Sequence, residues 1–198
     1  MGLAFLNYTV GGHARRNKPF FHYRGLGAAL AFTHSAAHDY EQIRILLIAI
    51  ECAVKAVKKY GGWCEPALSY TIAPVHDEAY FVKLAKELVQ MGADSICIKD
   101  MANLLLPMDA YSLVKALKET VKVPIHLHTH NTSGTGDMTL LMAAYAGVDI
   151  VDTALSPMAN GTSQPATESL VATLKGTVRD TGLDLGKMSD AAVHFRKV

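Results

Sequence analysis

The segment ADSICIKDMANLLLPMDAYSLVKALKETVKVPIHLHTH, residues 93–130, decides the fold because it places one helix between two short strands. The first strand, residues 95–99, and the second, residues 124–129, alternate small or polar with apolar side chains, as strands do. Residues 107–121 carry apolar side chains at helical spacing and begin with a proline, which suits the first turn of a helix. The segment therefore predicts a β-α-β unit with parallel strands and a right-handed crossover.

The same alternation extends on both sides of this unit. It predicts four helices and four strands, the helices over 41–62, 76–92, 107–121 and 139–147 and the strands near 66–72, 95–99, 124–129 and 149–154. Such strands fit a doubly wound sheet or part of a (β/α)8 barrel. Polar side chains end every strand, as in barrel enzymes, and no Gly-x-Gly-x-x-Gly turn follows any of them. These features favour an α/β fold with about four C-terminal units of a TIM barrel.

The chain divides into three parts by pattern. Residues 1–40 are irregular and show no convincing strand, residues 41–186 carry the partial barrel, and residues 187–198 form a tail. A complete barrel takes about 250 residues, so the four units supply about half of one.

Composition excludes several classes of protein. Half of the 198 residues are hydrophobic, which suffices for a globular core. The net charge is +1 and the sequence has no basic block, so it lacks the basic patch that is typical of nucleic-acid-binding proteins. No segment reaches the roughly 20 apolar residues of a membrane span, and none resembles a signal peptide. The three cysteines, Cys52, Cys64 and Cys97, form no paired pattern. We expect a soluble protein of the reducing cytoplasm.

Three histidines alternate along the strand PIHLHTHN, residues 124–131. His126, His128 and His130 share one face of the strand, and alternate residues lie roughly 6.6 Å apart. One interpretation is a polar strand whose histidines bind the backbone. The other is a chelating site, because neutral imidazole is the commonest metal ligand.

Two other segments contribute candidate groups. Lys99 ends its strand on the face that Ser95 and Cys97 share, and would point into the barrel mouth if Ile96 and Ile98 pack against the helices. A surface ion pair with the adjacent acid is the alternative. Since an ammonium cannot ligate a metal, the lysine would have to be neutral or carbamylated. After the last strand, residues 156–169 predict either a loop that closes over a ligand or an ordinary surface turn.

The segments GADSICIKDMANLLLP, VPIHLHTHNTSG and VDIVDTALSPMANGTSQPATESL together resemble the carboxyltransferase domain of biotin-dependent enzymes. This family includes pyruvate carboxylase, the oxaloacetate decarboxylase α-subunit and the transcarboxylase 5S subunit, and it is related to the HMG-CoA lyase-like metal-dependent TIM barrels. The resemblance covers residues 50–186 and implies that residues 41–186 are a partial carboxyltransferase domain.

The resemblance implies carboxyl transfer between carboxybiotin, on a partner biotin carrier domain, and pyruvate or oxaloacetate. It implies a divalent metal ion, zinc, manganese or cobalt, acting as a Lewis acid. The metal ligands would be Lys99, His128 and His130, with Lys99 also the catalytic residue, and His126 would be a buried neighbour. Asn131 and Asn103 stand where the family has aspartate and glycine. The change at Asn131 removes a charge that could orient a metal-bound histidine.

The family's first four strands are not recognisable, and with them go a ligand aspartate, a glutamine and a substrate-binding arginine. The segment with the catalytic threonine is also missing. We therefore interpret the chain as a truncated or frameshifted product. It is either part of a carboxyltransferase or a non-catalytic half-barrel that needs a partner or oligomer; a metal-dependent lyase or aldolase is the alternative activity.

Overall fold

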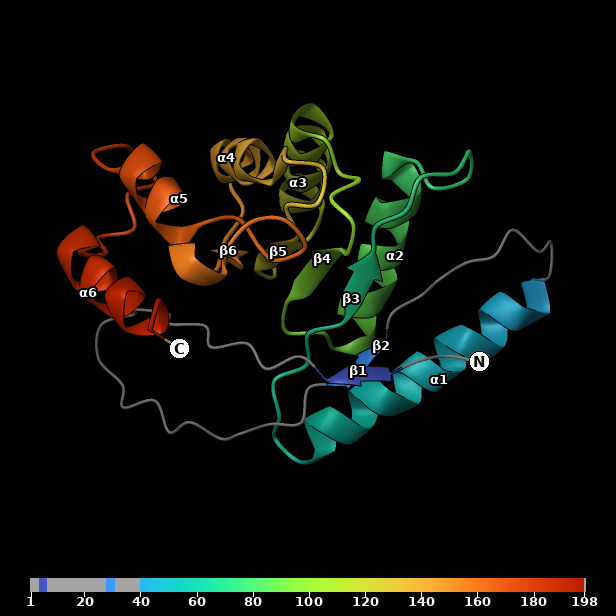
Figure 1. The fold of residues 1–198 in the computed structure, drawn as a ribbon. Helices are drawn as coiled ribbons and strands as arrows, with labels where there is room; N and C mark the ends of the chain where they lie inside the picture. Colours follow the sequence, from blue (N-terminus) through green and yellow to red (C-terminus); the bar gives the residue numbers. More distant parts are fainter. Residues whose placement is uncertain (1–3, 7–27, 31–39, 198) are drawn as a thin grey trace.

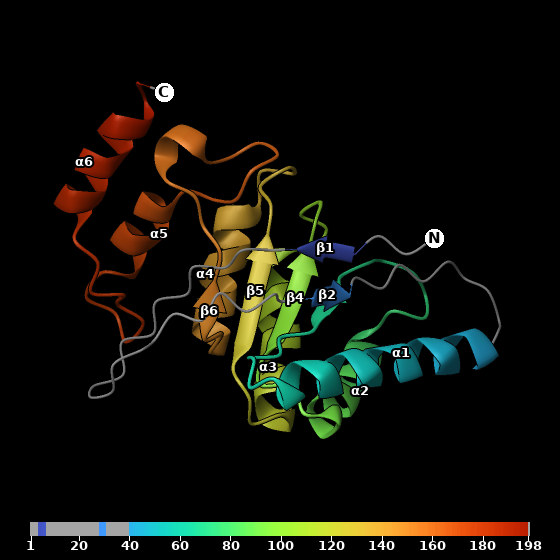
Figure 2. The same ribbon diagram turned by 90° about the horizontal axis from the view of Figure 1, so that it is seen from below.

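The computed structural model describes residues 4–6, 28–30 and 40–197. Its centre is a sheet of parallel strands in the order β3-β4-β5-β6, so each strand pairs with the next one in the chain. Figure 2 shows β4 and β5 side by side and pointing the same way. The four predicted strands are confirmed, with the bounds β3 Ala67–Ser69, β4 Ile96–Asp100, β5 Ile125–Thr129 and β6 Ile150–Val151.

Three helices join these strands and lie on the same side of the sheet (Figure 1). They are α2 (Glu78–Met91), α3 (Pro107–Thr120) and α4 (Gly136–Ala146). The Asp77 carboxylate accepts a hydrogen bond from the Tyr80 amide at the start of α2, and Gly92 ends this helix with a φ of 109°. The result is a repeated strand-helix unit, as the sequence predicts.

The main core lies between the sheet and these helices. Ile96 and Ile98 of β4 and Ile125 and Leu127 of β5 are fully buried in it. They pack with helix residues at helical spacing, among them Phe81, Ala85, Leu88, Leu113, Val114, Leu117, Leu140 and Ala143. Because strand side chains alternate, Cys97 and Lys99 of β4 and His126 and His128 of β5 face away from the helices. That opposite face carries the polar side chains of the candidate site.

The remaining helices flank the sheet. Helix α1 (Tyr40–Lys59) precedes β3, and the 3₁₀ turn η1 (Ser156–Met158), α5 (Thr167–Leu174) and α6 (Leu185–Phe195) follow β6. Helix α6 contacts α5 and η1, so most of the predicted tail, 187–198, is helical. Nowhere in residues 40–197 is there a helix with the length and apolarity that crossing a membrane requires. The division of the chain at residues 40 and 186 stays a prediction.

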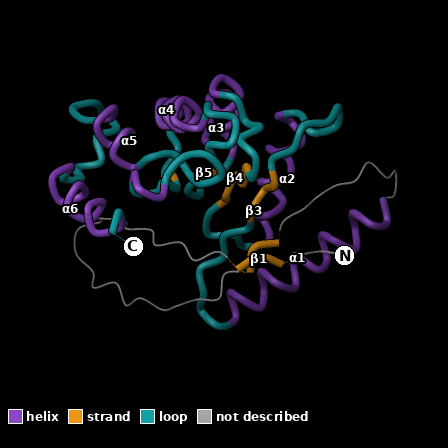
Figure 3. Tube along the Cα trace, in the orientation of Figure 1, coloured by secondary structure: helices purple, strands orange, loops and turns teal. Residues whose placement is uncertain are grey.

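Two short strands in the first part of the chain correct the sequence analysis. Strands β1 (Ala4–Leu6) and β2 (Ala28–Leu30) pair antiparallel, where no strand was expected (Figure 3). Each has three residues, which is too short to show a period-two alternation. The rest of residues 1–39 lies outside the described residues.

Candidate metal centre

Strand register brings Lys99 and His128 together. The two residues are Cα partners in the parallel pair β4–β5, and both lie on the face turned away from the helices. Adjacent strands run roughly 4.8 Å apart, so these side chains leave the sheet as neighbours. Asp152 follows β6 two residues after Ile150, which pairs with His126. Asp152 therefore lies level with His128, which is on the neighbouring strand β5.

His128 and His130 turn the same ring nitrogen toward each other. The two Nε2 atoms lie 3.3 Å apart. On the other side of each ring, His128 Nδ1 lies 2.7 Å from Asp152 Oδ2, and His130 Nδ1 lies 2.5 Å from the carbonyl oxygen of Thr162. Each imidazole is thus held at Nδ1 by an oxygen and presents Nε2 to the other.

This arrangement sets the tautomers and fits a cation. A carboxylate and a carbonyl only accept, so both Nδ1 atoms must donate, and in the neutral rings both Nε2 atoms carry lone pairs. Two facing lone pairs repel unless a proton or a metal ion lies between them. With Zn–N bonds of about 2.0–2.1 Å, the two nitrogens would be about 2.8–3.0 Å apart at octahedral angles and about 3.3–3.4 Å apart at tetrahedral angles. The observed separation of 3.3 Å fits a shared divalent ion.

Lys99 is buried beside this pair, with 3% of its surface exposed. A surface ion pair, the alternative considered from the sequence, does not describe such a residue. Its neighbour Asp100 is also fully buried, and the Asp100 carboxylate accepts hydrogen bonds from the Leu104 and Leu105 amides and from the Thr129 hydroxyl. Asp100 therefore orders the loop between β4 and α3.

Below the histidine pair, His126 lies between two carboxylates. Its Nδ1 is 2.9 Å from Glu65 Oε1, and its Nε2 is 3.1 Å from Asp152 Oδ1. Burial opposes the charged form, but hydrogen bonds with Asp152, Cys97 and Glu65 outweigh it and raise the pKa of His126 to about 12. Burial likewise favours neutral Asp152, yet hydrogen bonds from His126 and His128 hold the pKa of that carboxyl well below its usual range.

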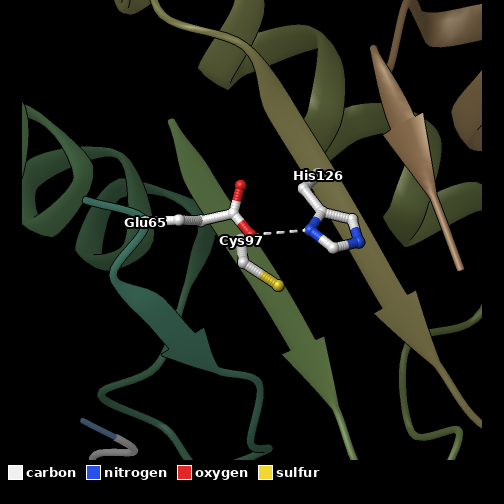
Figure 4. A group of neighbouring side chains, drawn as sticks. All are labelled: Glu65, Cys97 and His126. Atoms are coloured by element: carbon white, nitrogen blue, oxygen red, sulfur yellow. Dashed lines mark hydrogen bonds and ion pairs between the residues drawn. The ribbon is translucent and has the colours of Figure 1, made fainter. Parts of the chain in front are cut away.

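Glu65, Cys97 and His126 form a second cluster of donor atoms (Figure 4). One nitrogen, oxygen or sulfur atom from each lies within 4.8 Å of the others. The dashed line in Figure 4 joins Glu65 to His126 Nδ1, and His126 Nε2 faces Asp152. Carboxylates near both ring nitrogens and the raised pKa favour the charged form of His126. Its Nδ1 donates to Glu65, whereas Nε2 faces Asp152 as an ion pair without an aligned hydrogen bond.

Two asparagines order the loops around the centre. Asn103 has a φ of 55°, a left-handed conformation that asparagine tolerates better than most residues, so it can occupy a position where the resembling family has glycine. Its Oδ1 accepts hydrogen bonds from the Ser133 hydroxyl and from the Thr135 amide and hydroxyl. Asn103 therefore joins the loop after β4 to the loop after β5.

Asn131 lacks the charge that an aspartate would bring to this position, and its side-chain amide binds other groups than the histidines. Its Nδ2 donates to Asp137 Oδ2 at 3.0 Å and to Asn160 Oδ1 at 2.8 Å, and its Oδ1 accepts from the Gly136 amide at 2.9 Å. Asp152 and the Thr162 carbonyl orient the histidines instead. Asn131 connects the start of α4 with the loop that holds His130.

Replacing Asn131 by aspartate should lower the free energy of unfolding by about 1–3 kcal/mol, because a buried carboxylate gives Asp137 no donor and repels it. Urea denaturation of the Asn131→Asp variant measures the loss. Adding Asp137→Asn should restore most of it, since the donor and acceptor then exchange places. A single variant as stable as the parent protein would contradict this account.

Most of the chain, including the candidate centre, matches one known protein family. The HMGL-like family model matches residues 30–194. The chain belongs to the HMGL-like family. The matched span contains Lys99, His128, His130 and Asp152, so the whole candidate centre lies within the HMGL-like region.

Curated relatives within this group include carboxylases and a carboxyltransferase. A pyruvate carboxylase subunit from Methanocaldococcus jannaschii is 54% identical over 149 residues, 75% of this chain and 26% of the relative. The 2-oxoglutarate carboxylase large subunit of Hydrogenobacter thermophilus is 44% identical over 151 residues, 75% of this chain and 23% of that protein. The methylmalonyl-CoA carboxyltransferase 5S subunit of Propionibacterium freudenreichii is 45% identical over 148 residues, which are 74% of this chain and 29% of that protein. The chain spans about a quarter of the length of these relatives.

A solved structure gives the same assignment. The carboxyl transferase domain of Rhizobium etli pyruvate carboxylase, solved with pyruvate and biocytin, aligns with a TM-score of 0.72 and 40% identity. The alignment covers 74% of this chain and 26% of that chain. The fold is thus α/β and part of a TIM barrel, as the sequence predicted, and the resemblance to biotin-dependent carboxyltransferases is confirmed at the level of the HMGL-like family.

The structure brings the three predicted ligands to one edge of the sheet and adds residues that the sequence did not single out. Asp152 is one of the polar residues that end the predicted strands, and its position level with His128 on the neighbouring strand is the signal that could have found it. Glu65 precedes β3 without any motif. The Thr162 carbonyl is a backbone group, but it does lie in the loop predicted to close over a ligand.

Proposed function

We propose that this chain supplies one half of the carboxyltransferase barrel that moves a carboxyl group between carboxybiotin and pyruvate or oxaloacetate. The facing Nε2 atoms of His128 and His130, each ring held at Nδ1, are the observation that carries the proposal. The names of the relatives support the reaction class, and the R. etli structure with pyruvate and biocytin supports the choice of substrate and carrier.

Lys99, His128 and His130 would hold the metal ion, with Lys99 as a carbamate. Zinc, manganese or cobalt bound there would act as a Lewis acid that stabilises negative charge developing on the substrate oxygen. The protein's own groups do the rest: Asp152 keeps the proton of His128 on Nδ1, and the Thr162 carbonyl does so for His130. Lys99 is almost closed to solvent, and in a site that excludes water interactions with charge are stronger.

The half-barrel needs further strands to close. Within the described residues, β3 and β6 are the edge strands of the parallel sheet, and a closed barrel has no edges. We propose that the remaining strands come from another part of the protein, a partner chain or an oligomer, and that a biotin carrier domain delivers the carboxyl group. We place the protein in the cytoplasm, in keeping with the free cysteines Cys52, Cys64 and Cys97.

Isotope exchange tests the proposal. Metal-loaded protein, mixed with a biotinylated carrier domain, should exchange labelled carboxyl groups between oxaloacetate and the carrier. Avidin should block the exchange, and the His128→Ala variant should lack it. Absence of exchange in protein that demonstrably binds the metal would overturn carboxyl transfer by this chain and favour the non-catalytic half-barrel. Cleavage of a substrate without biotin would favour the lyase alternative.

A further inference from the structure

A continuous series of polar contacts connects the metal centre with the protein surface. It begins at Trp63, which is 62% exposed and whose indole N–H donates to the Ser95 hydroxyl at 2.9 Å. Ser95 donates to Glu65 Oε2, and Glu65 Oε1 accepts from His126. The series then passes through Asp152 and reaches the ligand His128. It crosses the interior face of the sheet.

Both carboxylates in this series use both of their oxygens. Glu65 accepts from Ser95 at one oxygen and from His126 at the other. Asp152 faces His126 with Oδ1 and His128 with Oδ2. A carboxylate held at one oxygen can still rotate about its last bond, whereas one held at both has a single orientation. The ion-pair contact of His126 with Oδ1 therefore helps to fix the Asp152 carboxylate, whose Oδ2 accepts from His128.

His126 in turn depends on Glu65. The ring is 2% exposed, and Glu65 Oε1 lies 2.9 Å from its Nδ1. Without that acceptor, a buried N–H would be left unsatisfied, and the ring would lose the contact that fixes its rotation. A shift of the ring moves Nε2 away from Asp152 Oδ1. The orientation of His128 thus depends on Glu65. Glu65 precedes β3 and is not on the strands that carry the proposed metal ligands.

We propose that Glu65 and His126 are positioning residues of the metal centre, acting through Asp152 to fix the tautomer and rotation of His128. This inference rests on the proposed metal site at His128 and His130. Partners of a metal-bound histidine outside the ligand set commonly affect metal affinity by 10–100-fold. Glu65 is two contacts further from the ligand than Asp152, so the effect of its removal should lie at the low end of that range.

Titration of the metal-free protein with Co²⁺, followed by visible absorption, tests the inference. Glu65→Leu should weaken Co²⁺ binding about tenfold and change the absorption bands of the bound ion, because the ligand ring moves. Glu65→Gln keeps an oxygen for His126 and an amide for Ser95, and should restore most of the affinity. In an Asp152→Asn background, Glu65→Leu should cause little further loss, since the connection is already broken.

Asp149→Asn is the matched control. Asp149 accepts from the Ile125 amide and pairs with Lys118, next to the same strand but outside the series. This variant should lower thermal stability without changing the Co²⁺ affinity or spectrum. Ser95→Ala provides a milder second variant in case Glu65→Leu does not fold, and it should weaken binding in the same direction by a smaller factor.

The outcomes separate the two proposals. If the parent protein binds no Co²⁺, the proposed metal site fails. If the parent protein binds Co²⁺ while Glu65→Leu, or Ser95→Ala in its place, keeps the parent affinity and spectrum, the positioning role fails and the metal site stands. An equal loss from Glu65→Leu in the parent and Asp152→Asn backgrounds would also overturn it, because the effect would not pass through Asp152.

Discussion

The His128→Ala variant is expected to bind no measurable divalent metal. His128 supplies one of the two nitrogens that face each other 3.3 Å apart, and its removal leaves His130 without a second imidazole on the ion. Loss of a direct ligand should exceed the 10–100-fold effect of losing an outer partner. Elemental analysis of purified protein, together with Co²⁺ titration, measures the change.

His194→Ala is the control for His128→Ala, because His194 is an exposed histidine on α6, away from the sheet. It should retain the full metal content of the parent protein. Metal retained at parent level in His128→Ala would show that the ion, if bound, lies elsewhere, and the assignment of His128 would fail with it.

Lys99→Met should lower metal affinity by at least about 100-fold, again more than the loss of an outer partner. Methionine has a similar length and suits a buried position, so the fold should persist. If Lys99 binds the metal as a carbamate, affinity in the parent protein should also rise with added bicarbonate, while Lys99→Met should show no such dependence. Co²⁺ titrations with and without bicarbonate measure both effects, and carbon-13-labelled bicarbonate should give a carbamate resonance only in the parent protein.

Lys118→Met controls for general effects of removing a lysine. Lys118 pairs with Asp149 at the surface and does not contact the centre. This variant should keep both the affinity and the bicarbonate dependence of the parent. A bicarbonate dependence that persists in Lys99→Met would refute the carbamate, and parent-level affinity in that variant would refute the ligand role.

The parts of the fold with a strong repeating pattern could be predicted from sequence. Strands β4 and β5 were placed within one residue because Ile96, Ile98, Ile125 and Leu127 alternate cleanly. Helix α4 begins at Gly136, earlier than predicted, because its first turn is polar and carries no apolar period. Strands β1 and β2 and helix α5 were missed or read as loop, because so few residues give little periodic signal. Helix α6 was read as a tail although it is as long as α4.

The candidate site also has features that the sequence pattern predicts and features that it does not. That Lys99 and His128 leave the sheet on a shared face follows from alternation and from the parallel order of the strands. The partners of the histidines do not follow from any local pattern. Glu65 and His126 are 61 positions apart and His128 and Asp152 are 24 apart, so only the register of whole strands brings them together. The contacts of Asn131 could not be predicted for the same reason, since Asp137 lies in the first turn of α4 and Asn160 in the loop after β6.

The pairing of each strand with its successor in the chain has a consequence for folding. No contact between β3, β4, β5 and β6 has to wait for a distant strand, because the order in the sheet is the order of synthesis. Each pairing joins neighbouring β-α units, so each unit can add to the edge left by the one before. Lys99 would be in place before His128, and His128 before the aspartate that orients it. The centre would therefore assemble from one side to the other as the chain leaves the ribosome, with the histidines held in their final orientation only after β6 and the loop that follows it have docked.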